Sequence, residues 1–308
     1  MLLLLAALPT LFWDGGADTA SAVRQAGITQ LRVPAPRLAA WKGIGDITAD
    51  AGDLQGAVKL LAPTVNYRMN EAAATSLPWL VHNGWRFLRR PDGRFYYEVP
   101  GEQAALAAAE AFCYGIAAMI KTDAAGLGPL GAMLAFLRTI PEAALPPVAD
   151  IGYIDDGSAA SGEVMNLMVR SNLLFRLVAA PDRRLKVNVK LGSKEYSMED
   201  AKNPGTVAHL VRANLGDEKR SLRVYGSEVV VARLTASNGK ARLHLLNYAG
   251  ANRRVDGIRV RIAGEYSKHE LRAAGVTGVE LQDYTVEAGA TEFTLPELRT
   301  YAVIDLSR

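Results

Sequence analysis

Short apolar runs alternate with helix-like stretches over the first two thirds of the chain. The apolar runs end at Pro, Gly or acidic residues, which is typical of strands that stop at a turn. Between several of them, apolar residues recur at helical spacing. The predicted strands are residues 11–13, 28–33, 57–61, 85–88, 95–99, 116–120, 150–154 and 186–191. The predicted helices are residues 18–25, 102–114, 130–139, a segment that begins near Ser161, and a segment that begins at Pro204.

Two of these helices carry clear end signals. Ser161 is predicted to cap the first of them, which continues at helical spacing through Val178. The second has Asn203 at the N-cap, Pro204 at the first helical position and Gly216 just past its end.

Eight strands with interleaved helices predict an α/β fold, a compact (β/α) barrel-like domain over residues 1–222. Barrels of this kind have about 250 residues, with about 200 as the lower limit. Residues 66–83 have no predicted element. A doubly wound open sheet is therefore the alternative.

From about residue 223 the pattern changes to a period of two. Ile258, Val260 and Ile262 alternate with arginines, which predicts a strand with one buried and one exposed face. Residues 237–240 (SNGK) form the signal for a type I′ hairpin. Because no helix interrupts this region, residues 223–308 are predicted to be an all-β antiparallel sandwich.

Composition and motifs exclude several classes of function. The chain is 49% hydrophobic and 22% charged, as expected of a folded globular protein. A net charge of +3 predicts no nucleic-acid partner. The single cysteine, Cys113, allows no intrachain disulfide, and the four histidines lack metal-ligand spacing. Since phosphate-binding and dinucleotide-binding motifs are also absent, we expect no metal and no cofactor.

The first ten residues (MLLLLAALPT) resemble part of a secretory signal, which predicts a periplasmic or secreted protein. No basic residue precedes Arg24, so a cytoplasmic protein with an apolar first strand is the alternative. The apolar run is far shorter than the ~20 residues that span a bilayer, and we expect no membrane span. The sequence does not indicate an oligomeric state.

Four segments together resemble bacterial barrel-type glycoside hydrolases with a C-terminal β-sandwich. They are residues 11–16 (LFWDGG), 94–100 (RFYYEVP), 151–157 (IGYIDDG) and 241–248 (ARLHLLNY). The resemblance implies a carbohydrate substrate and catalytic carboxylates at the ends of barrel strands. Many such enzymes carry an Asn-Glu pair at the end of the fourth strand; here Asn70-Glu71 lies in the region without a predicted element.

Acidic residues at the predicted strand ends are the catalytic candidates, because barrel active sites lie at the carboxyl ends of the strands. They are Glu98, Asp123, Asp155 and Asp156; Asp14, at another strand end, is predicted to bind substrate. Glycoside cleavage needs one carboxyl as acid and a second as nucleophile or base. Glu98 is the predicted acid, since Tyr96, Tyr97 and Val99 could form an apolar shell that raises its pKa. Asp155 or Asp156 is the predicted partner.

Each of these candidates also has a structural interpretation. Glu98 could be a carboxylate at a helix N-terminus, and residues 155–157 a polar turn. The predicted substrate-binding residues lie mostly near the tryptophan-rich first third of the chain, where an indole could stack on a sugar. They are Trp13, Asp14, Asn83, Trp85, Arg86, Tyr97 and Lys190, the last of which could meet an acidic sugar.

The predicted function is therefore that of a glycosidase with two catalytic carboxylates. The alternative is a non-catalytic carbohydrate-binding or structural module on a degenerate barrel. Fold by itself does not decide between them.

Overall fold

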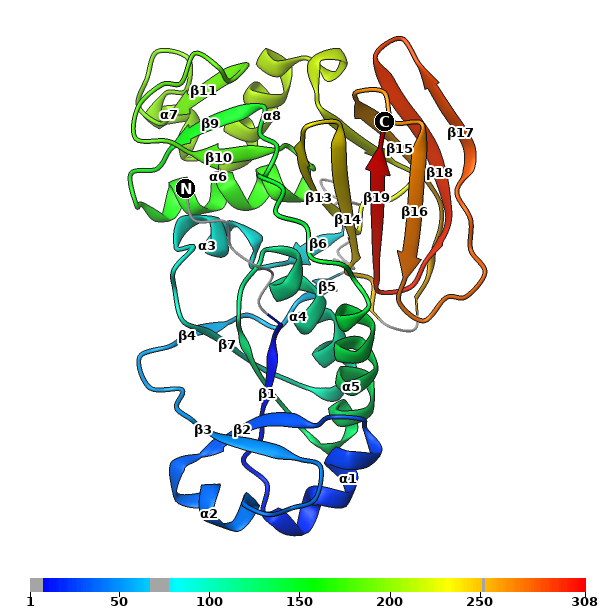
Figure 1. Cartoon of the computed structure of the whole chain (residues 1–308). Helices are drawn as coiled ribbons and strands as arrows, with labels where there is room; N and C mark the ends of the chain where they lie inside the picture. The colour runs from blue at the N-terminus through cyan, green and yellow to red at the C-terminus, as the bar shows by residue number, and fades with distance from the viewer. Residues whose placement is uncertain (1–7, 67–77, 251–252) are drawn as a thin grey trace, which may run out of the picture.

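The computed structural model describes residues 8–66, 78–250 and 253–308 (Figure 1). The Asn70-Glu71 pair and the first seven residues of the signal-like segment lie outside this range. In the described part of the chain, no helix is long and apolar enough to cross a membrane.

A six-stranded parallel sheet forms the core of the N-terminal half. Its strands, in spatial order, are β3 (Thr48–Gly52), β2 (Gln30–Pro34), β1 (Thr10–Phe12), β8 (Met119–Thr122), β7 (Phe95–Val99) and β4 (Val58–Leu60). Every neighbouring pair is parallel, as in the pairing of Leu11 with Leu31 and with Ile120.

Helices cover one face of this sheet (Figure 1). They are α1 (Ala20–Gln25), α4 (Gly101–Cys113) and α5 (Ala124–Arg138). Glycine permits their close approach: a Cβ on Gly131 of α5 would lie 1.7 Å from the carbonyl oxygen of Ala26, just after α1. The strand residues that face these helices, such as Leu11, Tyr97 and Ile120, are fully buried.

A second parallel sheet is separate from the first. Its order is β10 (Phe175–Leu177), β9 (Ile151–Ile154) and β11 (Val187–Lys190). It is accompanied by α6 (Ala159–Arg170), α7 (Met198–Ala201) and α8 (Pro204–Leu215). The predicted caps of α8 are confirmed: Asn203 accepts a hydrogen bond from the Gly205 N–H, and Gly216 follows the last turn with a φ of 73°.

The α/β core of parallel strands is therefore confirmed, whereas a closed barrel is not. Among the described residues, the parallel strands divide into sheets of six and three, and no pairing joins the two. The sheet of six has free edges at β3 and β4. Which strands pair across a barrel depends on contacts distant in sequence, and local apolar patterns do not encode these.

Two four-stranded antiparallel sheets form the C-terminal part. One contains, in order, β12 (Leu222–Tyr225), β15 (Val255–Ala263), β18 (Ala290–Leu298) and β17 (Gln282–Glu287). The other contains β13 (Val230–Ser237), β14 (Lys240–Asn247), β19 (Tyr301–Ser307) and β16 (Lys268–Ala273). Buried residues of both sheets share one apolar cluster. The predicted hairpin is confirmed, with Asn238 and Gly239 both at positive φ.

The remaining elements are short. They are the 3-10 turns Ala17–Thr19, Ala35–Arg37 and Asp217–Lys219, helices α2 (Leu38–Trp41) and α3 (Gly84–Arg89), and the antiparallel pair β5 (Thr64–Asn66) and β6 (Trp79–Val81).

Two local predictions are wrong. Residues 85–88 lie in a helix, α3, and not in a strand. The strand prediction failed because four apolar or long side chains in a row fit either element. Helix α6 is capped by Ser158, whose hydroxyl accepts from the Ser161 N–H, so Ser161 lies inside the helix. This helix ends at Arg170, and Phe175 begins β10.

Candidate functional site

Four charged side chains meet at the carboxyl ends of four neighbouring parallel strands. Lys121 Nζ on β8 lies 3.0 Å from Glu98 Oε1 on β7 and 3.0 Å from Asp14 Oδ2, two residues after β1. The other carboxylate oxygen of Glu98 accepts a hydrogen bond from Lys59 of β4. We call Asp14, Lys59, Glu98 and Lys121 the Glu98 cluster. Ligands of open parallel sheets bind at this end of the strands.

Strand alternation places the cluster on the face opposite the helices. In β7, Phe95, Tyr97 and Val99 are buried, whereas Tyr96 is half-buried and Glu98 is exposed. Successive side chains of a strand point to opposite faces, so Glu98 points away from α4. Glu98 is the register partner of Lys121, which explains their contact.

Other exposed polar side chains continue this face across the sheet. Arg32 of β2 is the register partner of Asp50 on β3, and both are exposed. Between Arg32 and Lys121 lies Phe12 of β1, the register partner of both. We call this side of the six-stranded sheet the open face.

The apolar environment predicted for Glu98 is wrong. Tyr97 and Val99 point to the helix side, and both oxygens of Glu98 contact ammonium groups instead. Lys59, followed by Lys121, holds the pKa of the Glu98 carboxyl below its usual value. Glu98 is therefore ionised at neutral pH, and an ionised carboxylate does not serve as the general acid.

Asp14, predicted to bind substrate, is brought together with Glu98. Since each contacts Lys121 Nζ at 3.0 Å, one oxygen of each carboxylate lies within about 6 Å of the other. Carboxyl groups of retaining glycosidases are about 5–5.5 Å apart, so this pair is compatible with such chemistry.

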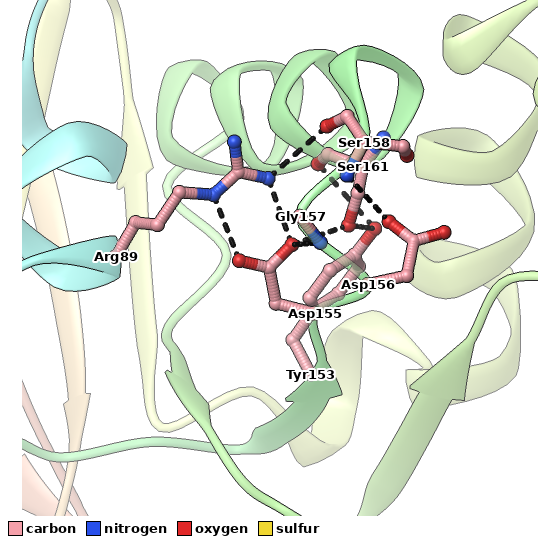
Figure 2. A network of polar contacts seen from close by, with 7 residues as sticks. All are labelled: Arg89, Tyr153, Asp155, Asp156, Gly157, Ser158 and Ser161. Atoms are coloured by element: carbon pink, nitrogen blue, oxygen red, sulfur yellow. Dashed lines mark hydrogen bonds and ion pairs between the residues drawn. The ribbon is translucent and has the colours of Figure 1, made fainter.

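Asp155 is an ion-pair partner rather than a second member of this cluster (Figure 2). Its two oxygens accept hydrogen bonds of 2.8 and 2.7 Å from the Arg89 guanidinium, and its side chain is 13% exposed. Burial acts to raise the pKa of Asp155, but Arg89, the Gly157 N–H and the Ser161 hydroxyl together hold it below the usual value. This pair joins α3 to the loop after β9.

Asp156 lies on the other side of that loop and is exposed. It accepts a hydrogen bond of 2.9 Å from the Ser158 N–H, and its contacts with Ser158 lower its pKa. Asp123 likewise caps a helix: its carboxylate accepts from the Gly126 N–H in the first turn of α5. These contacts agree with a structural role for each aspartate at the start of a helix.

The two tryptophans proposed as sugar platforms make internal contacts. Trp13 is buried, and its indole N–H donates to the Thr19 hydroxyl at 2.8 Å. Trp85 on α3 has the guanidinium groups of Arg86 and Arg89 over its ring, at 4.3 and 5.2 Å. The Arg86 guanidinium therefore stacks on the Trp85 ring, and it also donates a hydrogen bond of 3.3 Å to the His82 carbonyl.

Asn83 and Tyr97 belong to a buried network that the sequence analysis missed. Its centre is Glu110 of α4, which accepts hydrogen bonds from the Tyr97 hydroxyl (2.6 Å), the Tyr248 hydroxyl (2.6 Å) and the Asn83 N–H (2.7 Å). Burial raises the pKa of Glu110 against the effect of these donors. The lone acidic residue in the apolar run of α4 (ALAAAEAFC) is the signal that could have revealed it.

Lys190, at the end of β11, is exposed and belongs to the other parallel sheet. Lys59 and Lys121 are site residues that were not predicted from the sequence. Strand alternation alone could have placed them on one face with Glu98. Their contacts depend on which strands pair, and the spatial order β8-β7-β4 is decided by the tertiary structure.

Comparison with solved structures shows a likeness of fold to one glycoside hydrolase. The structure resembles α-L-fucosidase isoenzyme 2 from Paenibacillus thiaminolyticus with a TM-score of 0.53 and 10% sequence identity. The match covers 72% of this chain and 62% of the fucosidase, so this chain spans less than two thirds of that protein. At this identity the likeness shows the fold alone. No protein-family model and no curated protein matches the sequence.

Two further solved structures match at TM-scores too low to support a shared fold. They are a GH30 endoxylanase from Clostridium papyrosolvens C71 (TM-score 0.23, 10% identity, 98% of this chain and 97% of that chain) and a cycloisomaltooligosaccharide glucanotransferase from Paenibacillus sp. (TM-score 0.20, 13% identity, 50% and 27%).

Proposed function

We propose that this protein binds carbohydrate on the open face, with the Glu98 cluster at the centre of the site, and does not hydrolyse it. The observation that carries the proposal is the cluster itself: exposed carboxylates and ammonium groups held in place by one another at the carboxyl ends of adjacent parallel strands. Sugar hydroxyls both donate and accept hydrogen bonds. They match a surface on which fixed acceptors and fixed donors lie side by side.

The ion pairs of Glu98 argue against acid catalysis by this residue. Hydrolysis by two carboxylates begins with a protonated carboxyl beside the leaving oxygen. Glu98 has ammonium groups on both oxygens and a lowered pKa. A carboxylate of this kind accepts hydrogen bonds from hydroxyls without transferring a proton to them.

Glycoside hydrolysis is the second candidate, and the spacing of Asp14 and Glu98 favours it. In that mechanism Glu98, already ionised, would be the nucleophile, and Asp14 would be the acid. The two carboxylates are close enough for such a pair, with Lys121 between them.

One set of experiments separates the candidates. Wild-type protein is tested for binding to immobilised cello-, xylo-, malto- and fucosylated oligosaccharides, and for release of nitrophenol from the matching aryl glycosides, α-L-fucoside included. We expect binding without turnover, and we expect Glu98→Gln to weaken binding. The control is Glu280→Gln, which removes an exposed carboxylate outside the open face.

Turnover that Glu98→Gln lowers by a factor of at least about 100 would instead establish hydrolysis, since removal of an essential carboxylate has effects of this size. Absence of both binding and turnover with every sugar would contradict both candidates.

A further inference from the structure

Charges of opposite sign alternate across the whole open face. In the spatial order β4, β7, β8, β1, β2 and β3, the charged residues of that face form a row that begins at Lys59 and ends at Asp50. We call this the charged row; it consists of Lys59, Glu98, Lys121, Asp14, Arg32 and Asp50. Three acids and three bases cancel, so the row carries no net charge.

Backbone register places most of this row at one level. Glu98 pairs with Lys121, Lys121 with Phe12, Phe12 with Arg32, and Arg32 with Asp50. Phe12 packs closely at this level, because a Cβ on Gly52 would lie 3.0 Å from its ring. The row is therefore a continuous line across the sheet.

The row is long compared with a single sugar. Neighbouring strands lie about 4.8 Å apart, so the three spacings from Glu98 on β7 to Arg32 on β2 make roughly 14 Å. A single pyranose ring covers only a fraction of this distance. One monosaccharide at Glu98 would leave Arg32, three strands away, without contact.

A hollow adjoins the row at Arg32. Its volume is about 400 Å³, and it lies beside the amino ends of β1 and β8. Thr10, Arg32, Arg94 and Met119 contribute to its lining. Arg32 thus belongs both to the charged row and to the hollow.

We propose that the ligand of the open face is a neutral oligosaccharide of several units, which runs along the charged row from Glu98 to Arg32 and places one unit in the hollow. This inference rests on the proposed function. A row without net charge gives no electrostatic advantage to an acidic or a basic chain. The row instead offers hydrogen-bond acceptors and donors in alternation. Successive sugar units, each with several hydroxyls, would meet one such pair after another.

Titration calorimetry with ligands of increasing length tests the inference. The probes are cello-, xylo- and malto-oligosaccharides of one, two and four units, with oligogalacturonides of the same lengths as acidic comparison. For the neutral series that binds, we expect affinity to rise by about tenfold or more from one unit to four. Arg32→Ala should abolish this gain from one unit to four, whereas Glu98→Gln should weaken every length.

The control is Arg183→Ala, which removes an exposed arginine between β10 and β11, two strands of the other parallel sheet. Thermal unfolding of each variant establishes that it is folded, and Arg32→Gln replaces Arg32→Ala if the latter is not. Affinity that is independent of length, unaffected by Arg32→Ala or higher for the oligogalacturonides would overturn the inference while leaving the proposed function intact. Failure of all neutral sugars to bind would overturn the proposed function and the inference with it.

Discussion

Lys121 and Glu98 are register partners in the parallel pairing of β8 and β7, and their side chains form an ion pair of 3.0 Å. Because Lys121 also contacts Asp14 at 3.0 Å, a single ammonium group lies between two carboxylates. This arrangement keeps both acids on the open face and neutralises part of their charge. Both the proposed binding of carbohydrate and the alternative, its cleavage, depend on this arrangement.

The ion pairs of Glu98 predict a specific dependence of stability on pH. The folded-state pKa of Glu98 is lowered from 4.5, so its stabilising contribution is complete above that value and is lost as the pH falls through 4.5 towards the lowered pKa. The side chain is 42% exposed, so solvent screening limits the contribution to less than about 1 kcal/mol. Urea unfolding of wild type and Glu98→Gln across this range should show a difference that shrinks on acidification. A difference that grows on acidification would contradict the assignment.

The Arg89–Asp155 pair is predicted to stabilise the junction between α3 and the loop after β9. Both side chains are largely buried and the pairing is bidentate. Asp155→Asn should lower the free energy of unfolding by about 2 kcal/mol, because it leaves the Arg89 charge without its partner. Asp156→Asn changes the neighbouring, exposed carboxylate and should cost less than half as much. Equal losses in urea unfolding would show that the ion pair is not the cause.

Glu110 is predicted to matter for stability more than any exposed acid on the same helix. The Tyr97 hydroxyl donates to one carboxylate oxygen of Glu110 and the Tyr248 hydroxyl to the other. Glu110→Gln replaces one of these acceptors by an amide nitrogen, which should lower the free energy of unfolding by about 3 kcal/mol. Glu102→Gln in the first turn of α4 is the matched control, and its loss should stay below about 1 kcal/mol. Similar values for the two variants, measured by urea unfolding, would exclude a special role for the buried network.

Two helix glycines should respond to the same substitution by different amounts. A Cβ on Gly162 of α6 would lie 3.0 Å from the Trp85 ring, so Gly162→Ala should destabilise the protein by about 1–3 kcal/mol. Apart from its chain neighbours, a Cβ on Gly128 of α5 would meet nothing within 4 Å, so Gly128→Ala should cost less than Gly162→Ala; the following Pro129 offsets the usual gain of Ala over Gly in a helix. Thermal unfolding measures both. A loss at Gly128 equal to that at Gly162 would point to helix distortion rather than contact with Trp85.

The sequence by itself determined the elements whose signals are local. Asn203, Pro204 and Gly216 mark both ends of α8, because capping acts within one turn of a helix. The Asn238-Gly239 pair specifies its hairpin because a type I′ turn needs positive φ at its two central residues, which Asn and Gly adopt readily. The alternation around Ile258 likewise shows which face of β15 is buried.

The tertiary structure alone decided how these elements assemble and which side chains meet. It divides the parallel strands into two sheets, and it surrounds Glu98 with Lys59 and Lys121 instead of an apolar shell. It also brings Asp155 into an ion pair with Arg89, which is 66 residues away in the chain. Strand order and register join residues that are distant in sequence, and no local pattern of apolar and polar positions encodes those contacts.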